Sequence, residues 1–144
     1  MKVLHIFLRP VFASGLFLAQ FSSARTTWFT DNPYLVMGGA VSVAVAIGLL
    51  TRASLHLRRA ANKNQIAQSG PYRTIRHPVY VSIYLLSFGL GVMFFAWLWF
   101  VVLVAFIPLW YLECRREEQE MPGIYGTAYA RYREKTKMFI PGVI

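Results

Sequence analysis

Residues 70–80 read GPYRTIRHPVY and lead directly into an apolar run at 79–112. One helix over this run would be about 50 Å long, whereas the hydrocarbon core of a bilayer is about 30 Å thick. Two helices with a tight turn fit better. The turn is expected within 91–96, beside a cluster of aromatic residues of the kind that lies at membrane interfaces. The run therefore predicts a helical hairpin in a membrane, with spans at 78–93 and 96–113.

Two more apolar segments precede this hairpin, at 3–21 and 34–57. The first is interpreted as a retained span, because no clear cleavage site follows it. The second is rich in glycine, alanine and serine, which allow helices to approach closely in lipid. With 56% hydrophobic residues in 144, the sequence predicts an all-α integral membrane protein of one domain, 1–144, with about four transmembrane helices and a polar tail at 114–144.

The basic residues indicate the orientation. Four spans place the N-terminus, the loop before the third span and the tail on one side. These three regions contain every lysine and arginine except Arg25. The positive-inside rule therefore predicts cytoplasmic termini in the inner or plasma membrane. The net charge of +9 is explained by topology and by anionic lipid headgroups, so no nucleic acid partner is expected.

The tail is predicted to break at Pro122-Gly123 and to resume as a helix over 124–137. In that helix Tyr125, Tyr129 and Tyr132 would share one face.

Polar chemistry gathers at two places on the cytoplasmic side. In the first, Pro78 suits the first position of a helix, and His77 before it is expected to be extended. Free N–H groups at this helix start would suit an anionic group of a ligand. The alternative is a loop whose arginines and tyrosines only anchor the interface. The second place is the acidic cluster at the end of the fourth span. Adjacent carboxylates there, at Glu117 and Glu118, point about 100° apart, so one is expected to face inward.

The two clusters together resemble a known superfamily. SGPYRTIRHPVY, followed by REEQEMPGIYGTAYARY, is similar to the isoprenylcysteine carboxyl methyltransferase and phospholipid methyltransferase superfamily, with its Arg-His-Pro-x-Tyr stretch and later Glu-Glu pair. The resemblance covers Gln65 to the C-terminus. It implies an integral membrane enzyme that uses S-adenosylmethionine as its cofactor and methylates a lipophilic or small hydrophobic acceptor from the bilayer, such as a prenylcysteine-like carboxylate or a lipid amine.

The resemblance also implies site residues. The cofactor-binding set it gives is Gln65, Tyr72, Arg73, Thr74, Ile75, His77, Tyr80, Glu117 and Glu118. Aromatic rings suit a sulfonium, and a carboxylate suits an ammonium group. Arg115, Arg116 and His77 are expected to orient the substrate or to act as a base.

Two positions depart from the family pattern. Ser82 stands where relatives often have glycine, and Glu113 stands where prenylcysteine methyltransferases place a substrate-binding arginine. The departure at Glu113 bears on the prenylcysteine substrate more than on methyl transfer, and the two departures leave open a non-catalytic member of the same fold. A small four-helix transporter is a separate alternative. A metal site is not expected, because His56, His77 and Cys114 match no known ligand spacing.

Overall fold

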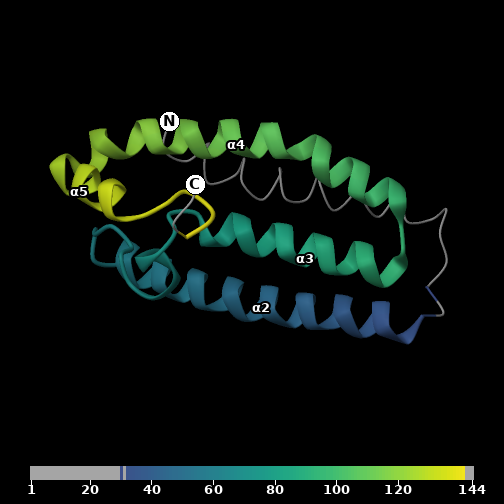
Figure 1. Ribbon diagram of the computed structural model, residues 1–144. Helices are drawn as coiled ribbons and strands as arrows, with labels where there is room; N and C mark the ends of the chain where they lie inside the picture. The colour runs from purple at the N-terminus through teal and green to yellow at the C-terminus, as the bar shows by residue number, and fades with distance from the viewer. Residues whose placement is uncertain (1–29, 31, 142–144) are drawn as a thin grey trace. The chain divides into compact units, whose positions relative to one another are not determined.

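The structure, a computed structural model, describes residue 30 and residues 32–141. All regular elements in these residues are helical: α2 (Pro33–Ala61), the 3₁₀ helix η1 (Gly70–Arg73), α3 (Pro78–Phe94), α4 (Trp97–Tyr125) and α5 (Thr127–Lys135) (Figure 1). The prediction of an all-α fold is confirmed for the described part of the chain. The predicted first span, 3–21, lies outside it.

Two of these helices are long and apolar enough to cross a membrane. They are α2 and α4, each of 29 residues, whereas α3 is a shorter apolar helix of 17 residues. At 1.5 Å per residue, α2 and α4 are each about 43 Å long, more than a hydrocarbon core of about 30 Å requires. Each helix therefore extends beyond the hydrocarbon core, and in each the end that extends is polar.

The two helices and the turn of the predicted hairpin are present, whereas their place in a membrane stays a prediction. A turn at Phe95 and Ala96 joins α3 to α4, inside the expected interval (Figure 1). Phe95 adopts a positive φ of 46°, and the Ala96 N–H donates to the Gly91 carbonyl at 3.2 Å. The chain reverses here because one residue takes the left-handed conformation that helices commonly use to stop.

The chain forms two compact units, and α2, α3 and α4 each contribute to both. The first unit contains the described residues up to Ala44 together with Ile83–Pro108. In it α2 and α3 approach closely, since a Cβ added at Gly39 would lie 2.6 Å from the Gly89 carbonyl oxygen. Ser42 Oγ also donates to the Leu85 carbonyl at 3.1 Å. The expectation that small residues on the second span allow close packing is confirmed.

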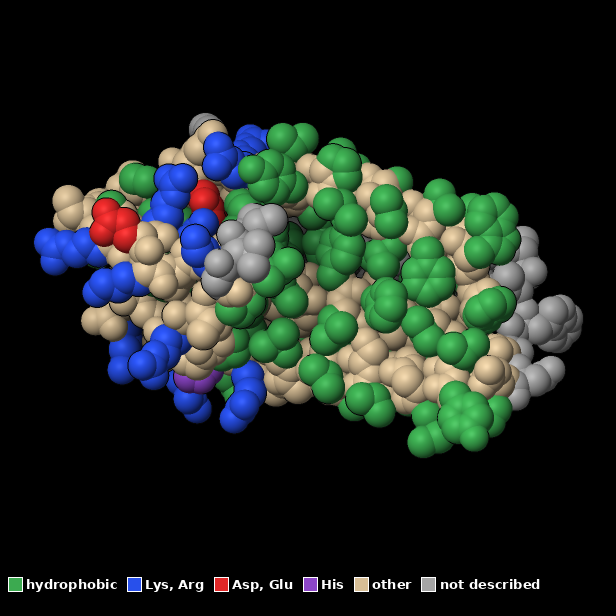
Figure 2. All heavy atoms as spheres, viewed as in Figure 1, with side chains coloured by type: hydrophobic (Ala, Val, Ile, Leu, Met, Phe, Trp, Pro, Cys, Tyr) green, Lys and Arg blue, Asp and Glu red, His purple; other side chains and the backbone are tan. Residues whose placement is uncertain are grey.

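The second unit contains Val45–Ser82 and the described residues from Leu109 onward. It holds the polar ends of α2 and α4, η1, the start of α3, and α5. Lys and Arg side chains gather over α5 and the end of α2 (Figure 2). All of the predicted site residues belong to this unit.

The predicted break at Pro122-Gly123 is wrong. The helix α4 continues through both residues to Tyr125, and the break comes at Gly126, whose φ is 56°. A proline removes only its own N–H from the helical ladder, and here the lost bond falls within the last turns of α4. Tyr125 therefore ends α4, while Tyr129 and Tyr132 are the buried residues of the separate helix α5.

Candidate functional site

The motif loop between η1 and α3 has the expected local structure. Pro78 is the first residue of α3, and His77 before it lies outside any helix. The His77 carbonyl accepts the Val81 N–H at 3.2 Å and so begins the ladder of α3. The fixed φ of proline suits this first position, where its missing N–H removes no intrahelical bond.

The segment after α5 lies alongside this loop. Ile75 and Lys137 form an isolated parallel β-bridge. The Arg76 N–H donates to the Lys137 carbonyl at 2.8 Å, and the His77 N–H donates to the Met138 carbonyl at 3.2 Å. The N–H of His77 is thus already used within the protein and is not left for a ligand.

Arg76 connects the motif loop to α4 and to the C-terminal segment. Its Nε donates to Glu118 Oε1 at 2.6 Å. Its Nη1 donates to the Arg133 carbonyl at 3.2 Å and also to the Thr136 carbonyl. A planar guanidinium suits this task, because its donors lie in a fixed fork. Arg76 therefore holds three separate stretches of chain in one arrangement.

Glu118 is the buried member of the acidic pair, with a side chain only 4% exposed. Its Oε1 also lies 3.3 Å from His77 Nε2, and its Oε2 lies 3.9 Å from Arg133 Nε. Burial raises the pKa of the Glu118 carboxyl, but hydrogen bonds from His77 and Arg76 and the charge of Arg76 outweigh it and lower the pKa to about 2. Glu118, which lies beyond the predicted span 96–113, is therefore ionised at neutral pH.

His77 lies between the two carboxylates. An ionised Glu118 can only accept, so the hydrogen of the His77–Glu118 bond belongs to Nε2. The other ring nitrogen, Nδ1, lies 3.9 Å from Glu117 Oε2. The Tyr80 hydroxyl also donates to Glu117 Oε2, at 3.4 Å. The structure thus brings together His77, Tyr80, Glu117 and Glu118, as the resemblance implied, and adds Arg76.

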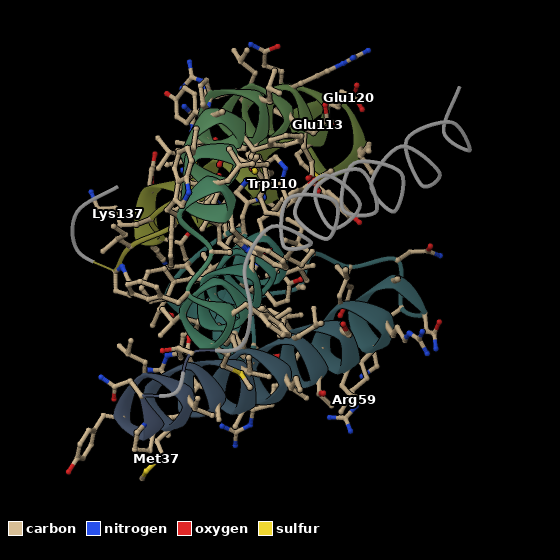
Figure 3. The ribbon with its side chains drawn as sticks, turned by 90° about the vertical axis from the view of Figure 1, so that its right-hand side faces the viewer. Met37, Arg59, Trp110, Glu113, Glu120 and Lys137 are labelled. Atoms are coloured by element: carbon tan, nitrogen blue, oxygen red, sulfur yellow. The ribbon has the colours of Figure 1, made fainter. Side chains whose placement is uncertain are left out.

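Aromatic rings surround this cluster. The Tyr80 ring meets the Trp110 ring edge to face at a centroid distance of 5.5 Å. In Figure 3 Trp110 lies on the side of α4 toward α3, whereas Glu120 points away from α3. Phe139 lies against His77 with ring centroids 5.8 Å apart. Sequence reasoning missed Trp110, although it precedes Cys114 and Glu118 on one helical face at intervals of four residues.

Tyr72 and Ile75, two more of the predicted cofactor residues, are buried supports. Tyr72 is 6% exposed, and its carbonyl accepts the Tyr132 hydroxyl at 2.8 Å. Burial raises the pKa of the Tyr132 hydroxyl to about 12, so it keeps the proton that it donates. Ile75 is also 6% exposed, and its backbone forms the bridge to Lys137.

The other predicted residues lie on the surface. Gln65, Arg73 and Thr74 are exposed, and the Thr74 hydroxyl donates to the Pro71 carbonyl at 3.2 Å. Arg115 is exposed, and Arg116 is 62% exposed with its Nε 4.0 Å from Glu120 Oε1. These five side chains are thus more exposed than the buried side chains of His77 and Glu118.

Two hollows can be described among the residues of the second unit that the structure describes. One, the Gln65 pocket, has a volume of about 630 Å³ and lies between the end of α2, the loop after it and Tyr125. The other, the α2 groove, has a volume of about 710 Å³ and lies between α2 and the segment Gly70–Ile75. Both fall within the range of small-molecule sites. Gln65 lines the first, whereas Thr74 and Ile75 line the second, so these three predicted cofactor residues border different hollows.

The two departures from the family pattern have clear structural settings. Ser82 is fully buried in α3, and its Oγ donates to the Pro78 carbonyl at 2.6 Å, so its hydroxyl is satisfied within its own helix. Glu113 lies on the same face of α4 as Glu120 (Figure 3). A charge of the opposite sign to arginine thus occupies that face.

A comparison with known families agrees with the motifs. The family model described as phospholipid methyltransferase matches residues 33–128, well over half of the 144-residue chain. The match includes the second predicted span, on which the motif resemblance did not depend, and stops before Tyr129. No curated protein and no solved structure matches the chain.

Proposed function

Because the chain belongs to the phospholipid methyltransferase family, within a superfamily of integral membrane methyltransferases, we propose that it transfers a methyl group from S-adenosylmethionine to a lipophilic acceptor at the cytoplasmic membrane face. The acceptor presents either a prenylcysteine-like carboxylate or a lipid amine. The observation that carries the proposal is the meeting of Arg76, His77 and Tyr80 with Glu117 and Glu118, which lie about forty residues apart in the sequence.

The proposal includes four membrane spans. The lengths and composition of α2 and α4 support two of them. α3 is a third candidate, since its 17 residues extend about 26 Å and its hairpin with α4 matches the sequence pattern. The fourth is the predicted span 3–21. This topology places the His77 cluster at the cytoplasmic surface, where the cofactor is available.

The chemistry of the cluster suits the cofactor. Bound S-adenosylmethionine supplies an electrophilic methyl group on a cationic sulfonium. Glu117 has a side chain 18% exposed and accepts from the Tyr80 hydroxyl, so a carboxylate and an aromatic residue adjoin each other. A carboxylate pairs with an ammonium group and an aromatic face attracts a cation. We assign both roles to this pair.

Glu118 has a different role in this proposal. Its Oε1 already accepts from Arg76 and His77, and little of its side chain is accessible. Glu118 and Arg76 orient the His77 ring, in the way that a buried carboxylate orients a catalytic histidine. The Gln65 pocket is a poorer place for the cationic part of the cofactor, because its charged lining residues, Arg59 and Lys63, are both basic.

The role of His77 depends on the acceptor. A carboxylate acceptor attacks the methyl group without losing a proton, whereas a protonated amine must lose one first. With Nε2 donating to Glu118, Nδ1 of a neutral His77 is the nitrogen that accepts such a proton. His77 is therefore required as a base only for an amine acceptor, and Arg115 and Arg116 are placed by this proposal at the acceptor's anionic group.

The transporter alternative has less support. Proton-coupled carriers use an acid within a span, and the predicted spans at 34–57 and 78–93 contain none. A non-catalytic relative would keep the cluster but lose turnover. Cofactor binding separates the transporter from both others, and turnover separates the enzyme from its inactive relative.

Calorimetry on the purified chain in detergent tests the proposal. We expect binding of S-adenosylmethionine and of its demethylated product, and a loss of about tenfold in affinity for Glu117→Gln, since hydrogen bonds to charged groups are worth about 1.5–3 kcal/mol. Glu120→Gln is the matched control, because Glu120 lies on the same helix, 44% exposed and next to Arg116. If the wild-type chain binds neither compound, the proposal is wrong.

A further inference from the structure

The α2 groove changes its chemistry along the helix. Its α2 wall consists of Val45, Gly48 and Leu49, followed by Arg52 and His56. Their spacing is i, i+3, i+4, i+7 and i+11, which places all five in one stripe on one face of α2. The first three belong to the apolar part of this candidate span, and the last two to its polar end. A ligand along this stripe would meet an apolar surface first and a basic surface next.

The basic end of the groove is held in place by the opposite wall. His56 Nδ1 lies 2.7 Å from Ser69 Oγ. A Cβ added at Gly70 would lie 2.5 Å from the His56 ring, so the ring packs directly on the backbone of the loop. Thr74 adds a hydroxyl to the lining on the same side. The groove thus has a fixed polar end made from two elements.

No carboxylate offsets the basic residues of the groove. Neither Asp nor Glu lines it, and the sequence contains no acid between Asp31 and Glu113. Over Val45–Ser82 the chain instead carries six basic residues, Arg52, Arg58, Arg59, Lys63, Arg73 and Arg76. In the described residues, the ion pairs of this stretch with acids involve Arg76 and His77, away from the groove. The groove therefore favours an anion.

We propose that the α2 groove binds a bilayer phospholipid, with its phosphate at Arg52 and His56 and the start of an acyl chain along Val45, Gly48 and Leu49. Arginine forms strong, paired hydrogen bonds with phosphate, and basic pockets beside membrane helices attract anionic headgroups. A free phosphate would use only the basic end, whereas a phospholipid uses the whole stripe. Thr74 and Ile75 of the predicted cofactor set line this groove, but His77, Tyr80 and Glu117 do not. The lipid proposal therefore does not depend on the roles assigned to these last three residues.

Native mass spectrometry of the full chain from detergent micelles tests this site, with phosphatidylglycerol as the probe. We expect Arg52→Gln to weaken retention of the lipid about fivefold, since that is about the contribution of one basic residue to anionic lipid binding near a membrane surface. Arg58→Gln is its control: Arg58 is also exposed and basic at the end of α2, but it does not line the groove. An equal loss in both variants would mean diffuse attraction by surface charge and would overturn the proposal.

A second pair of variants tests the apolar end. A Cβ at Gly48 meets nothing within 4 Å and Gly48 lines the groove, so Gly48→Leu places an apolar side chain there with better helix propensity. Gly38 has the same open surroundings outside the groove, and Gly38→Leu is the control. We expect Gly48→Leu alone to reduce retention. Equal retention of diacylglycerol, which lacks the phosphate, or full displacement of the lipid by inorganic phosphate, would each contradict the proposed occupant.

Discussion

The substitution Glu118→Gln tests the central contact of the site. Gln keeps the shape of the side chain and removes its charge. In the wild type this carboxylate, 4% exposed, faces Arg76 Nε at 2.6 Å and His77 Nε2 at 3.3 Å. The variant leaves both partners in place but without an anion. We therefore expect a folded protein of clearly lower stability.

The pKa of Glu118 gives the size of the effect. A fall from 4.5 to about 2 means that the surroundings favour the ionised carboxyl, at about 1.4 kcal/mol per pH unit, by about 3 kcal/mol. For a chain of this length, such a loss lowers the unfolding midpoint by about 10 °C. Glu120→Gln, at the exposed pair with Arg116, is expected to cost less than about 1 kcal/mol.

The pH dependence provides an independent check. Because folding lowers the pKa of Glu118, its contribution is complete above pH 4.5 and is lost as the pH falls towards about 2. The difference in midpoint between wild type and Glu118→Gln should therefore be full at pH 7 and shrink below pH 4.5. Circular dichroism in detergent micelles, in parallel thermal scans at pH 7, 4 and 3, measures it. Equal midpoints for Glu118→Gln and Glu120→Gln at pH 7, or a difference that does not shrink in acid, would refute the assigned contacts.

Two further substitutions test the supports of the motif loop. Gly70→Ala should lower the free energy of unfolding by about 1–3 kcal/mol, because Gly70 has a φ of 61° and its added Cβ would meet the His56 ring. Gly123→Ala, in open space within α4, should raise the free energy of unfolding by about 0.5–1 kcal/mol. Chemical denaturation measures both, and a loss of stability in both variants would contradict the reasoning. Tyr132→Phe should lower the free energy of unfolding by about 1 kcal/mol, because it removes the hydrogen bond to the Tyr72 carbonyl. Amide hydrogen exchange at η1 should become faster in this variant. Unchanged exchange at η1 would show that this hydrogen bond does not hold the loop.

The parts of the fold that could be predicted from sequence are those set by local physics. The apolar run at 79–112 is too long for one span, so a turn had to interrupt it, and Phe95 and Ala96 lie where the glycines and aromatic residues indicated. Pro78 and His77 are likewise placed by the steric rules for proline. These features depend on residues close together in the chain, and the sequence displays such residues directly.

The parts that could not be predicted depend on distant partners. Pro122-Gly123 reads as a break, yet the helix continues to Tyr125, since a proline removes only its own N–H from the helical ladder. The pairing of Arg76 and His77 with Lys137 and Met138 uses backbone groups, which leave no mark in the sequence. The grouping of Gln65 and Thr74 with His77 comes from the family resemblance and stays a prediction, and in the structure these two residues line different hollows.

The division of work between the two glutamates decides how binding experiments must be read. On the helix, adjacent residues point about 100° apart, so the sequence shows only that the two differ. The structure assigns the inner position to Glu118 through Arg76, which also holds the carbonyls of Arg133 and Thr136. A loss of cofactor binding in Glu118→Gln would therefore follow from displacement of His77 and the C-terminal segment as readily as from a lost contact. Glu117 contacts Tyr80 and His77, which are themselves assigned to the cofactor site. A loss in Glu117→Gln at unchanged unfolding midpoint therefore points to that site, so Glu117 is the residue on which cofactor recognition should be tested.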